Sequence, residues 1–177
     1  MTDSDDLLER IRRRVVRPAT VRELEQALRL PRDQRRSFER RLKKLVASGT
    51  LVRIRGKRYG LPEKMNLIVG RVHINPRGFG FLTPESTSDF DQDIYIAGTN
   101  LHQAMHGDRV VARIERRVQH ERIEGRIVRI LDRRTTTLVA RYDSDESGLS
   151  FVVPFDRRII MDVHIPSTDR GGAKPGE

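Results

Sequence analysis

The sequence of 177 residues contains no cysteine and no tryptophan, and aromatic residues make up only 5% of it. The lack of cysteine excludes a disulfide framework, a thiolate zinc site and a cysteine nucleophile. No apolar run approaches the roughly 20 residues that a membrane-spanning helix needs. The first ten residues, MTDSDDLLER, are acidic, whereas a secretory signal begins with basic residues followed by an apolar stretch. The sequence therefore predicts a soluble, cytoplasmic protein without a membrane partner.

Positive charge is abundant, and it lies in the first third of the chain. The 35 Lys and Arg residues outnumber the 25 Asp and Glu residues, which gives a formal net charge of +10. Residues 1–62 hold 18 Lys and Arg and 8 Asp and Glu, while residues 63–177 hold 17 of each kind. This asymmetry predicts at least two units with different surfaces. A strongly basic unit makes nucleic acid the leading class of partner.

The pattern of residues 1–62 predicts three short helices followed by a β-hairpin. Apolar residues recur at helical spacing in three segments, and Pro18 and Pro31 end the first two. Thr20 and Glu23 have the spacing of a capping box at the start of the second helix. The segments LVRI and RYGL, separated by the turn RGK, are predicted to form the hairpin. This order is that of a winged helix-turn-helix domain.

Basic side chains gather on the third predicted helix and on the hairpin. On the helix they lie two positions from the apolar residues, about 200° around the helix, so the basic stripe is predicted to lie opposite the apolar one. The candidate phosphate-binding residues are Arg36, Arg40, Lys43, Lys44, Arg53, Arg55, Lys57 and Arg58. Such a surface neutralises phosphates, and its binding weakens steeply with salt. The alternative is a solvated basic face without a ligand, and nothing in the pattern demands recognition of a base sequence.

From Met65 onward the pattern changes to alternating apolar residues separated by turn signals. It predicts five short antiparallel strands over residues 65–131, with the turn NPRG at 75–78 between the first two. Five short strands favour a small closed barrel of the OB-fold type.

Residues 135–177 repeat part of this predicted barrel. The segment DIYIAGTNLHQAMHGD at 93–108 matches DVHIPSTDRGGAKPGE at 162–177 without a gap. The second copy lacks a counterpart of the last two strands, so we expect an incomplete barrel in a fragment of a longer protein. Because such a barrel has unpaired strand edges and a half-covered core, residues after about 135 are expected to be poorly ordered or to pair with another chain. The predicted fold class is α+β multidomain: a winged helix-turn-helix at 1–62, an OB-fold barrel at 65–131 and a truncated second OB-fold at 135–177.

Three aromatic residues on adjacent predicted strands are the main candidate binding site. Phe79, Phe81 and Tyr95 have the alternation that places them on one outer face of the sheet, with the intervening apolar residues inside the barrel. Exposed rings offer stacking platforms for unpaired bases, worth about 1–3 kcal/mol per base. Arg77 is suited to hold a phosphate or to stack through its guanidinium. The alternative is that the rings only cover the surface of the barrel.

The stretch RGFGF at 77–81, followed by DIYIA at 93–97, resembles the paired RNA-binding motifs of cold-shock domains. Ala97 departs from that pattern, because many cold-shock domains have a histidine there. The order of the three predicted units resembles the amino-terminal region of the ribonuclease R family of bacterial exoribonucleases. The segments AMHGD at 104–108 and EGRIVRIL at 124–131 also resemble the first cold-shock domain of that family.

The family resemblance implies processive 3′→5′ hydrolysis of RNA that releases nucleoside 5′-monophosphates. The catalytic domain of the family lies downstream of these units, and clustered aspartates there hold Mg²⁺. On this resemblance the chain is expected to capture RNA, mainly single-stranded, and to feed it to that absent domain without cutting it. Structured RNA and the ribosome are further expected partners, and no cofactor is expected in this chain.

The second copy keeps two of the three aromatic positions in altered form. Phe151 corresponds to Phe81 and His164 corresponds to Tyr95, whereas the counterpart of Phe79 is a leucine. Phe151 and His164 are therefore the candidate RNA-binding residues of the second copy.

No catalytic or metal-binding residues are predicted in the chain. Asp89, Asp91 and Asp93 have the spacing that begins a calcium loop, but the glycine and glutamate that complete it are absent. His102 and His106 lie four positions apart without the glutamate of a zinc motif.

Two alternative functions remain open: a winged-helix DNA-binding transcription regulator with an accessory OB barrel, and a protein-interaction module.

Overall fold

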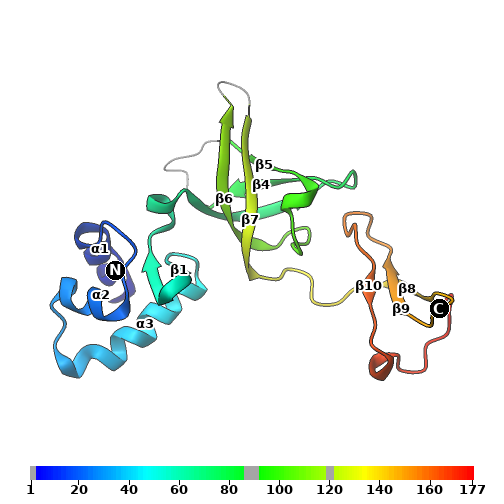
Figure 1. Ribbon diagram of the computed structural model, residues 1–177, viewed down its shortest axis with the longest axis horizontal. Helices are drawn as coiled ribbons and strands as arrows, with labels where there is room; N and C mark the ends of the chain where they lie inside the picture. The colour runs from blue at the N-terminus through cyan, green and yellow to red at the C-terminus, as the bar shows by residue number, and fades with distance from the viewer. Residues whose placement is uncertain (1–2, 86–91, 119–121) are drawn as a thin grey trace.

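The computed structural model describes residues 3–85, 92–118 and 122–177. Along the chain it contains a helical head (3–60), a five-stranded barrel (67–132) and a three-stranded sheet (140–164) (Figure 1). The head lies on one side of the barrel and the three-stranded sheet on the other (Figure 1). The structure thus contains three successive units along the chain.

The helical head consists of three α-helices and a hairpin. Its helices are α1 (Asp3–Arg14), α2 (Val21–Leu28), the 3-10 helix η1 (Arg32–Gln34) and α3 (Arg35–Ala47). The predicted capping box is present, since the Glu23 N–H donates to Thr20 Oγ1 at 3.3 Å and the Thr20 N–H donates to Glu23 Oε2 at 2.6 Å. Apolar residues of all three α-helices share one core, in which Ile11, Leu24 and Phe38 are at most 2% exposed. Helices this short are marginal alone, so this shared core stabilises the head.

The hairpin of the head pairs β1 (Val52–Ile54) with β2 (Arg58–Gly60). Gly56 in its turn has a φ of 77°, in the left-handed region that favours glycine. Tyr59 exchanges backbone hydrogen bonds of 2.8 and 2.9 Å with Ala19, which lies between α1 and α2. The hairpin is therefore tied to the helices rather than free.

The central unit is the predicted closed five-stranded barrel. Its strands are β3 (Leu67–Ile74), β4 (Gly80–Pro84), β5 (Ile94–Ile96), β6 (Arg109–Val118) and β7 (Arg122–Asp132), and they close in the order β3-β4-β5-β7-β6. The prediction that every pair is antiparallel is wrong, because β5 pairs with β7 in parallel. β6 runs antiparallel to β3, and β7 folds back on β6, so β7 runs in the same direction as β5 when it closes the barrel.

The barrel core is built from the inward-facing residues of these strands. Val72, Leu82, Ile94 and Ile96 are fully buried. Burying each such side chain contributes about 1.5–3 kcal/mol. Because side chains alternate along a strand, the neighbours of these residues point outward.

The third unit is a sheet of three antiparallel strands. They are β8 (Ala140–Ser144), β9 (Ser150–Pro154) and β10 (Val163–His164), with β9 in the centre. Its hydrogen bonds repeat those of the barrel. Val72 exchanges backbone bonds with the segment ending at Asp108, at 2.7 and 3.0 Å, and Tyr142 does so with the segment ending at Glu177, at 2.7 and 2.9 Å. The sequence repeat is therefore also a repeat of local structure.

The head and the barrel share a small apolar contact. Val52 of the hairpin packs in one buried cluster with Leu67 and Val111 of the barrel. Beside it, the Arg109 guanidinium donates to the Ser48 carbonyl oxygen at 2.6 Å. The C-terminal end of α3 and the hairpin are thus attached to the wall of the barrel.

Candidate nucleic-acid interface

The turn between β3 and β4 presents Arg77 next to the aromatic residues in sequence. Asn75 shapes the turn, because its Oδ1 accepts the Arg77 N–H and its carbonyl accepts the Gly78 N–H, both at 2.9 Å. Gly78 has a φ of 91°, which favours glycine. The Arg77 side chain is exposed at the tip of this hairpin.

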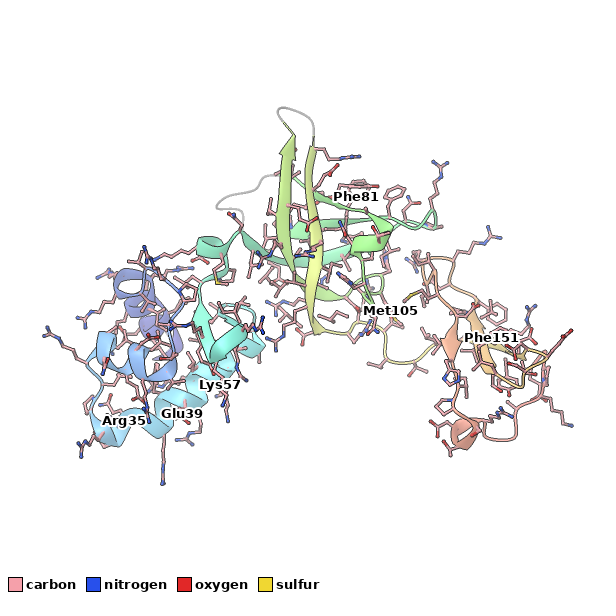
Figure 2. All side chains as sticks on the ribbon, viewed as in Figure 1. Arg35, Glu39, Lys57, Phe81, Met105 and Phe151 are labelled. Atoms are coloured by element: carbon pink, nitrogen blue, oxygen red, sulfur yellow. The ribbon has the colours of Figure 1, made fainter. Side chains whose placement is uncertain are left out.

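Phe79, Phe81 and Tyr95 form one ring cluster on the outside of the barrel. The ring centroids lie 5.7 Å apart for Phe79–Phe81, 5.7 Å for Phe79–Tyr95 and 5.9 Å for Phe81–Tyr95. Phe81, labelled in Figure 2, is 38% exposed, and the other two rings are half-buried. The prediction that the three rings share one outer face is confirmed, and none of them belongs to the barrel core. The cluster leaves ring surface available for stacking.

The strand register extends this aromatic face into a row across four strands. His73 on β3 pairs with Phe81 on β4, Phe81 pairs with Tyr95 on β5, and Tyr95 pairs with Glu124 on β7. Neither His73 nor Glu124 was among the site residues predicted from the sequence. His73 lies between the buried residues Val72 and Ile74, so the alternation along β3 already placed it outside. The face is therefore aromatic in its centre and polar at both ends.

Arg122 covers part of the Tyr95 ring. Its Cζ atom lies 4.2 Å from the ring centroid, and its Nη2 lies 2.5 Å from Glu124 Oε1. The guanidinium is thus held between a ring and a carboxylate while half of the side chain stays exposed. Arg122 was not predicted as a site residue, because its proximity to Tyr95 depends on the parallel pairing of β5 with β7.

All eight candidate phosphate-binding residues of the head have exposed side chains. The basic stripe of α3 lies opposite its buried apolar stripe, as predicted. Arg58 is engaged within the head, because its Nη1 lies 3.1 Å from Glu23 Oε2 and donates to the Pro18 carbonyl at 3.0 Å. Hydrogen bonds from Thr20, followed by the charge of Arg58, lower the pKa of Glu23. Within the part of the chain that the structure describes, the other seven side chains have no ion pair or hydrogen bond, so their charges are available to an anion.

The second copy reproduces the register of the aromatic pair but not the ring cluster. Phe151 pairs with His164 across β9 and β10, as Phe81 pairs with Tyr95 across β4 and β5. Phe151, labelled in Figure 2, is half-buried, and His164 is exposed. Among the described residues, ring–ring contacts of the aromatic face occur only in the first copy.

His106 is a half-buried histidine beside the aromatic row. Its Nδ1 accepts the Ile74 N–H at 3.2 Å, and its ring centroid lies 5.5 Å from that of His73. Burial, followed by the charge of Arg158, lowers the pKa of His106. The neutral form of the imidazole therefore fits this position.

Only one of the three acidic candidates lies in the part of the chain that the structure describes. Asp93 accepts a hydrogen bond from Thr83 at 2.8 Å, while Asp89 and Asp91 lie outside the described residues. Over residues 3–85, 92–118 and 122–177, no group of three or more His, Asp or Glu side chains is placed to hold a metal ion. Of the helices in these segments, none combines the length and the apolar character needed to cross a membrane.

The closed barrel with an exposed aromatic face is an OB-fold of a known type. Residues 70–130 match the family model described as the ribonuclease B OB domain. The barrel therefore belongs to this class of OB domain, which confirms the predicted OB-fold.

The chain as a whole is homologous to bacterial ribonuclease R. It is 35% identical to ribonuclease R of Acidithiobacillus ferrooxidans over 159 residues, which cover 90% of this chain and 35% of that protein. It is 36% identical to ribonuclease R of Escherichia coli (strain K12) over 171 residues, which cover 96% of this chain and 20% of that protein. The resemblance to the ribonuclease R family is thus confirmed.

The chain spans about a third or less of the length of these curated relatives. The solved structures similar to it include Mycoplasma genitalium RNase R in complex with ribose methylated single-stranded RNA. That match has a TM-score of 0.43 and 22% identity, and it covers 51% of this chain and 14% of the other.

Proposed function

We propose that this chain is an RNA-binding region of a ribonuclease R-type 3′→5′ exoribonuclease. The observation that carries the proposal is the cluster of Phe79, Phe81 and Tyr95 on the outside of the barrel, with Phe81 38% exposed. Rings of this kind stack on unpaired bases of any sequence, and duplex bases are already stacked on each other. The barrel is therefore proposed to select single-stranded over double-stranded RNA.

The basic head is proposed to act as a winged helix-turn-helix that attracts the phosphate backbone. The seven exposed candidate side chains of α3 and the hairpin that have no partner among the described residues support this role, since each phosphate neutralised releases counterions. The head would capture single-stranded or structured RNA, and the contact with the barrel would keep the captured strand near the rings.

The third unit is proposed to be part of a second OB-fold of the cold-shock type, with Phe151 and His164 as contacts to RNA. Its hydrogen bonds and strand register, which repeat those of the first barrel, support this assignment. The three units together would lead an RNA strand toward a Mg²⁺-dependent catalytic domain, which in such an enzyme would release nucleoside 5′-monophosphates. We expect this activity in the cytoplasm and no hydrolysis by the 177 residues alone.

The proposal is tested by measuring the binding of one labelled sequence as single-stranded RNA, duplex RNA and duplex DNA at the same salt concentration. The protein should prefer single-stranded RNA, and the double variant Phe79→Ala with Phe81→Ala should lose roughly 1–3 kcal/mol of that binding free energy per stacked base. Phe155→Ala is the matched control, because Phe155 is 67% exposed outside the ring cluster. A preference for one duplex DNA sequence would instead support a transcription regulator. Unchanged RNA affinity of the double variant would support a protein-interaction module.

A further inference from the structure

A groove lies on the barrel where β5 and β7 separate. The two strands pair only through Tyr95–Glu124 and Ile96–Gly125, after which the chain leaves β5 and β7 continues to Asp132. The groove has a volume of about 470 Å³ and is lined by His102 and Gln103 on one side and by 126–130 of β7 on the other. Among the described strands, none pairs with this edge of β7 beyond Gly125. The barrel thus leaves an open site along this edge of β7.

The lining of the groove is basic and apolar without any carboxylate. Arg129 is exposed and has no ion pair within the described segments, while Arg126 lies 3.0 Å from Glu115. Val128 is 44% exposed, and His102 presents an exposed imidazole. The Arg129 guanidinium beside apolar side chains suits a ligand that carries both negative charge and apolar surface. A nucleotide combines phosphate with sugar and base in this way.

The groove continues the aromatic row rather than standing apart from it. Glu124 is the β7 residue opposite Tyr95, and Arg126 is the next outward residue along the same strand. Two residues of a strand extend over about 7 Å. A strand of RNA that stacks on Phe81 and Tyr95 can therefore enter the groove with its next nucleotides.

We propose that this groove binds the sugar–phosphate backbone of the RNA nucleotides that follow those stacked on the rings, with Arg129 as a direct phosphate ligand. This inference rests on the proposed RNA-binding function and adds a second subsite to it. The bound single strand then contacts the rings first and the groove second. The affinity should therefore keep increasing when the RNA is longer than the few nucleotides that stack on the rings.

The test compares oligouridylates of about three and about eight nucleotides, because one OB-fold contacts on the order of 4–16 nucleotides. Two variants alter the groove: Arg129→Gln removes the free charge, and Val128→Asp adds a carboxylate at an exposed position. Arg13→Gln is the control for net charge, because Arg13 is exposed on α1 and makes no ion pair within the described residues.

Arg129→Gln should weaken binding of the eight-nucleotide RNA about fivefold and leave the three-nucleotide RNA unchanged. Its salt dependence should fall by a slope of about 0.7, the value for one phosphate of a single strand. Val128→Asp should weaken binding of the eight-nucleotide RNA further. Arg13→Gln should change neither the affinity for this RNA nor its salt dependence. Both groove variants could bind the eight-nucleotide RNA like the unaltered protein while the double variant Phe79→Ala with Phe81→Ala loses affinity. That result would show that the groove is not on the RNA path, and the groove would then be better interpreted as a site for an added peptide strand. If the ring variant also keeps full affinity, the RNA-binding proposal itself fails.

Discussion

Arg122 shows how one side chain shapes the aromatic face. Its guanidinium lies on the Tyr95 ring and is held by Glu124. A planar guanidinium stacks on a base as well as on a ring and donates hydrogen bonds in a fixed fork. In the proposed RNA complex a base would therefore stack on the side of the guanidinium that faces away from the Tyr95 ring.

Replacing Arg122 should weaken RNA binding modestly. We expect Arg122→Ala to lose about 0.5–1 kcal/mol of binding free energy for single-stranded RNA, which is the size of an exposed cation–π contact. Arg122→Lys should not restore the loss, because an ammonium group keeps the charge without the plane. Fluorescence anisotropy with a labelled oligouridylate measures both variants. Full rescue by lysine would show that Arg122 acts only as a charge.

His106 should make the stability of the barrel depend on pH. Its pKa is lowered in the folded state, mainly by burial, and Arg158, His73 and Asp156 are the charged groups that act on it. An unfolded histidine has a pKa of about 6.5. The stabilisation is therefore present above that pH and is lost as the pH falls through the lower pKa of the folded state. Chemical denaturation at a series of pH values should show this loss, and His106→Gln should flatten it. If the unaltered protein and the His106→Gln variant lost the same stability as the pH fell below 6.5, the assignment would be contradicted.

At the scale of single residues, the alternation of side chains along the strands predicted the aromatic cluster, but it did not predict that Arg122 lies on the Tyr95 ring. Phe79 and Phe81 lie two positions apart, so one face was dictated by the strand period. Arg122 reaches Tyr95 only because distant strands meet in parallel, and no local pattern in the sequence carries that information.

At the scale of elements, the contact between head and barrel is the feature with the clearest consequence. Arg109 donates to the Ser48 carbonyl and pairs with Glu85 at 2.6 Å and with Asp132 at 3.4 Å. Gly49 reinforces the contact, because a Cβ atom there would lie 2.6 Å from the Leu131 side chain. The end of α3 is therefore fixed to the barrel by a hydrogen bond from a charged donor as well as by packing.

Removing the Arg109 side chain should release the head. Arg109→Ala leaves the Ser48 carbonyl and Glu85 without this donor, a loss of about 1–3 kcal/mol. We expect small-angle scattering to show a larger radius of gyration, and thermal unfolding to separate into two transitions. Arg113→Ala on the same strand is the control, because Arg113 is exposed and has no partner among the described residues. An unchanged radius and a single transition for Arg109→Ala would show that the apolar cluster alone fixes the head.

The sequence predicted the elements better than their contacts. Spacing of apolar residues and the capping box defined α2, and alternation with turn residues defined β3 and β4. The parallel β5–β7 pair was missed because alternation gives the faces of a strand and not its direction. The contact of head and barrel was missed because Val52, Leu67 and Val111 have the pattern of core residues of their own units.

At the scale of the whole molecule, charge and aromatic surface lie on different units that are joined by a firm contact. The excess of positive charge predicted from residues 1–62 lies on the exposed face of α3 and the hairpin. The rings lie on the barrel. RNA bound by both units would gain its affinity from phosphates on the head and its preference for single strands from bases on the barrel.

If the head binds phosphates and the barrel stacks bases, variants of the two units should differ in the salt dependence of RNA binding. Neutralising Arg36, Arg40, Lys43 and Lys44 together should reduce the salt slope by about 0.7 for each phosphate that the head no longer neutralises, while the ring variants keep the slope. Affinities measured over a range of salt concentrations give both slopes. Equal slopes for the unaltered protein and the neutralised head would exclude the head from the RNA site.

The most direct test of the central claim is an NMR titration that follows the ring signals of the folded chain. Single-stranded RNA should shift the ring resonances of Phe79, Phe81 and Tyr95, because stacked bases change the magnetic environment of a ring. The ring of Phe38, buried in the head and 2% exposed, should stay unshifted as an internal control. Binding that moves signals of the head while these three rings remain unchanged would contradict the claim.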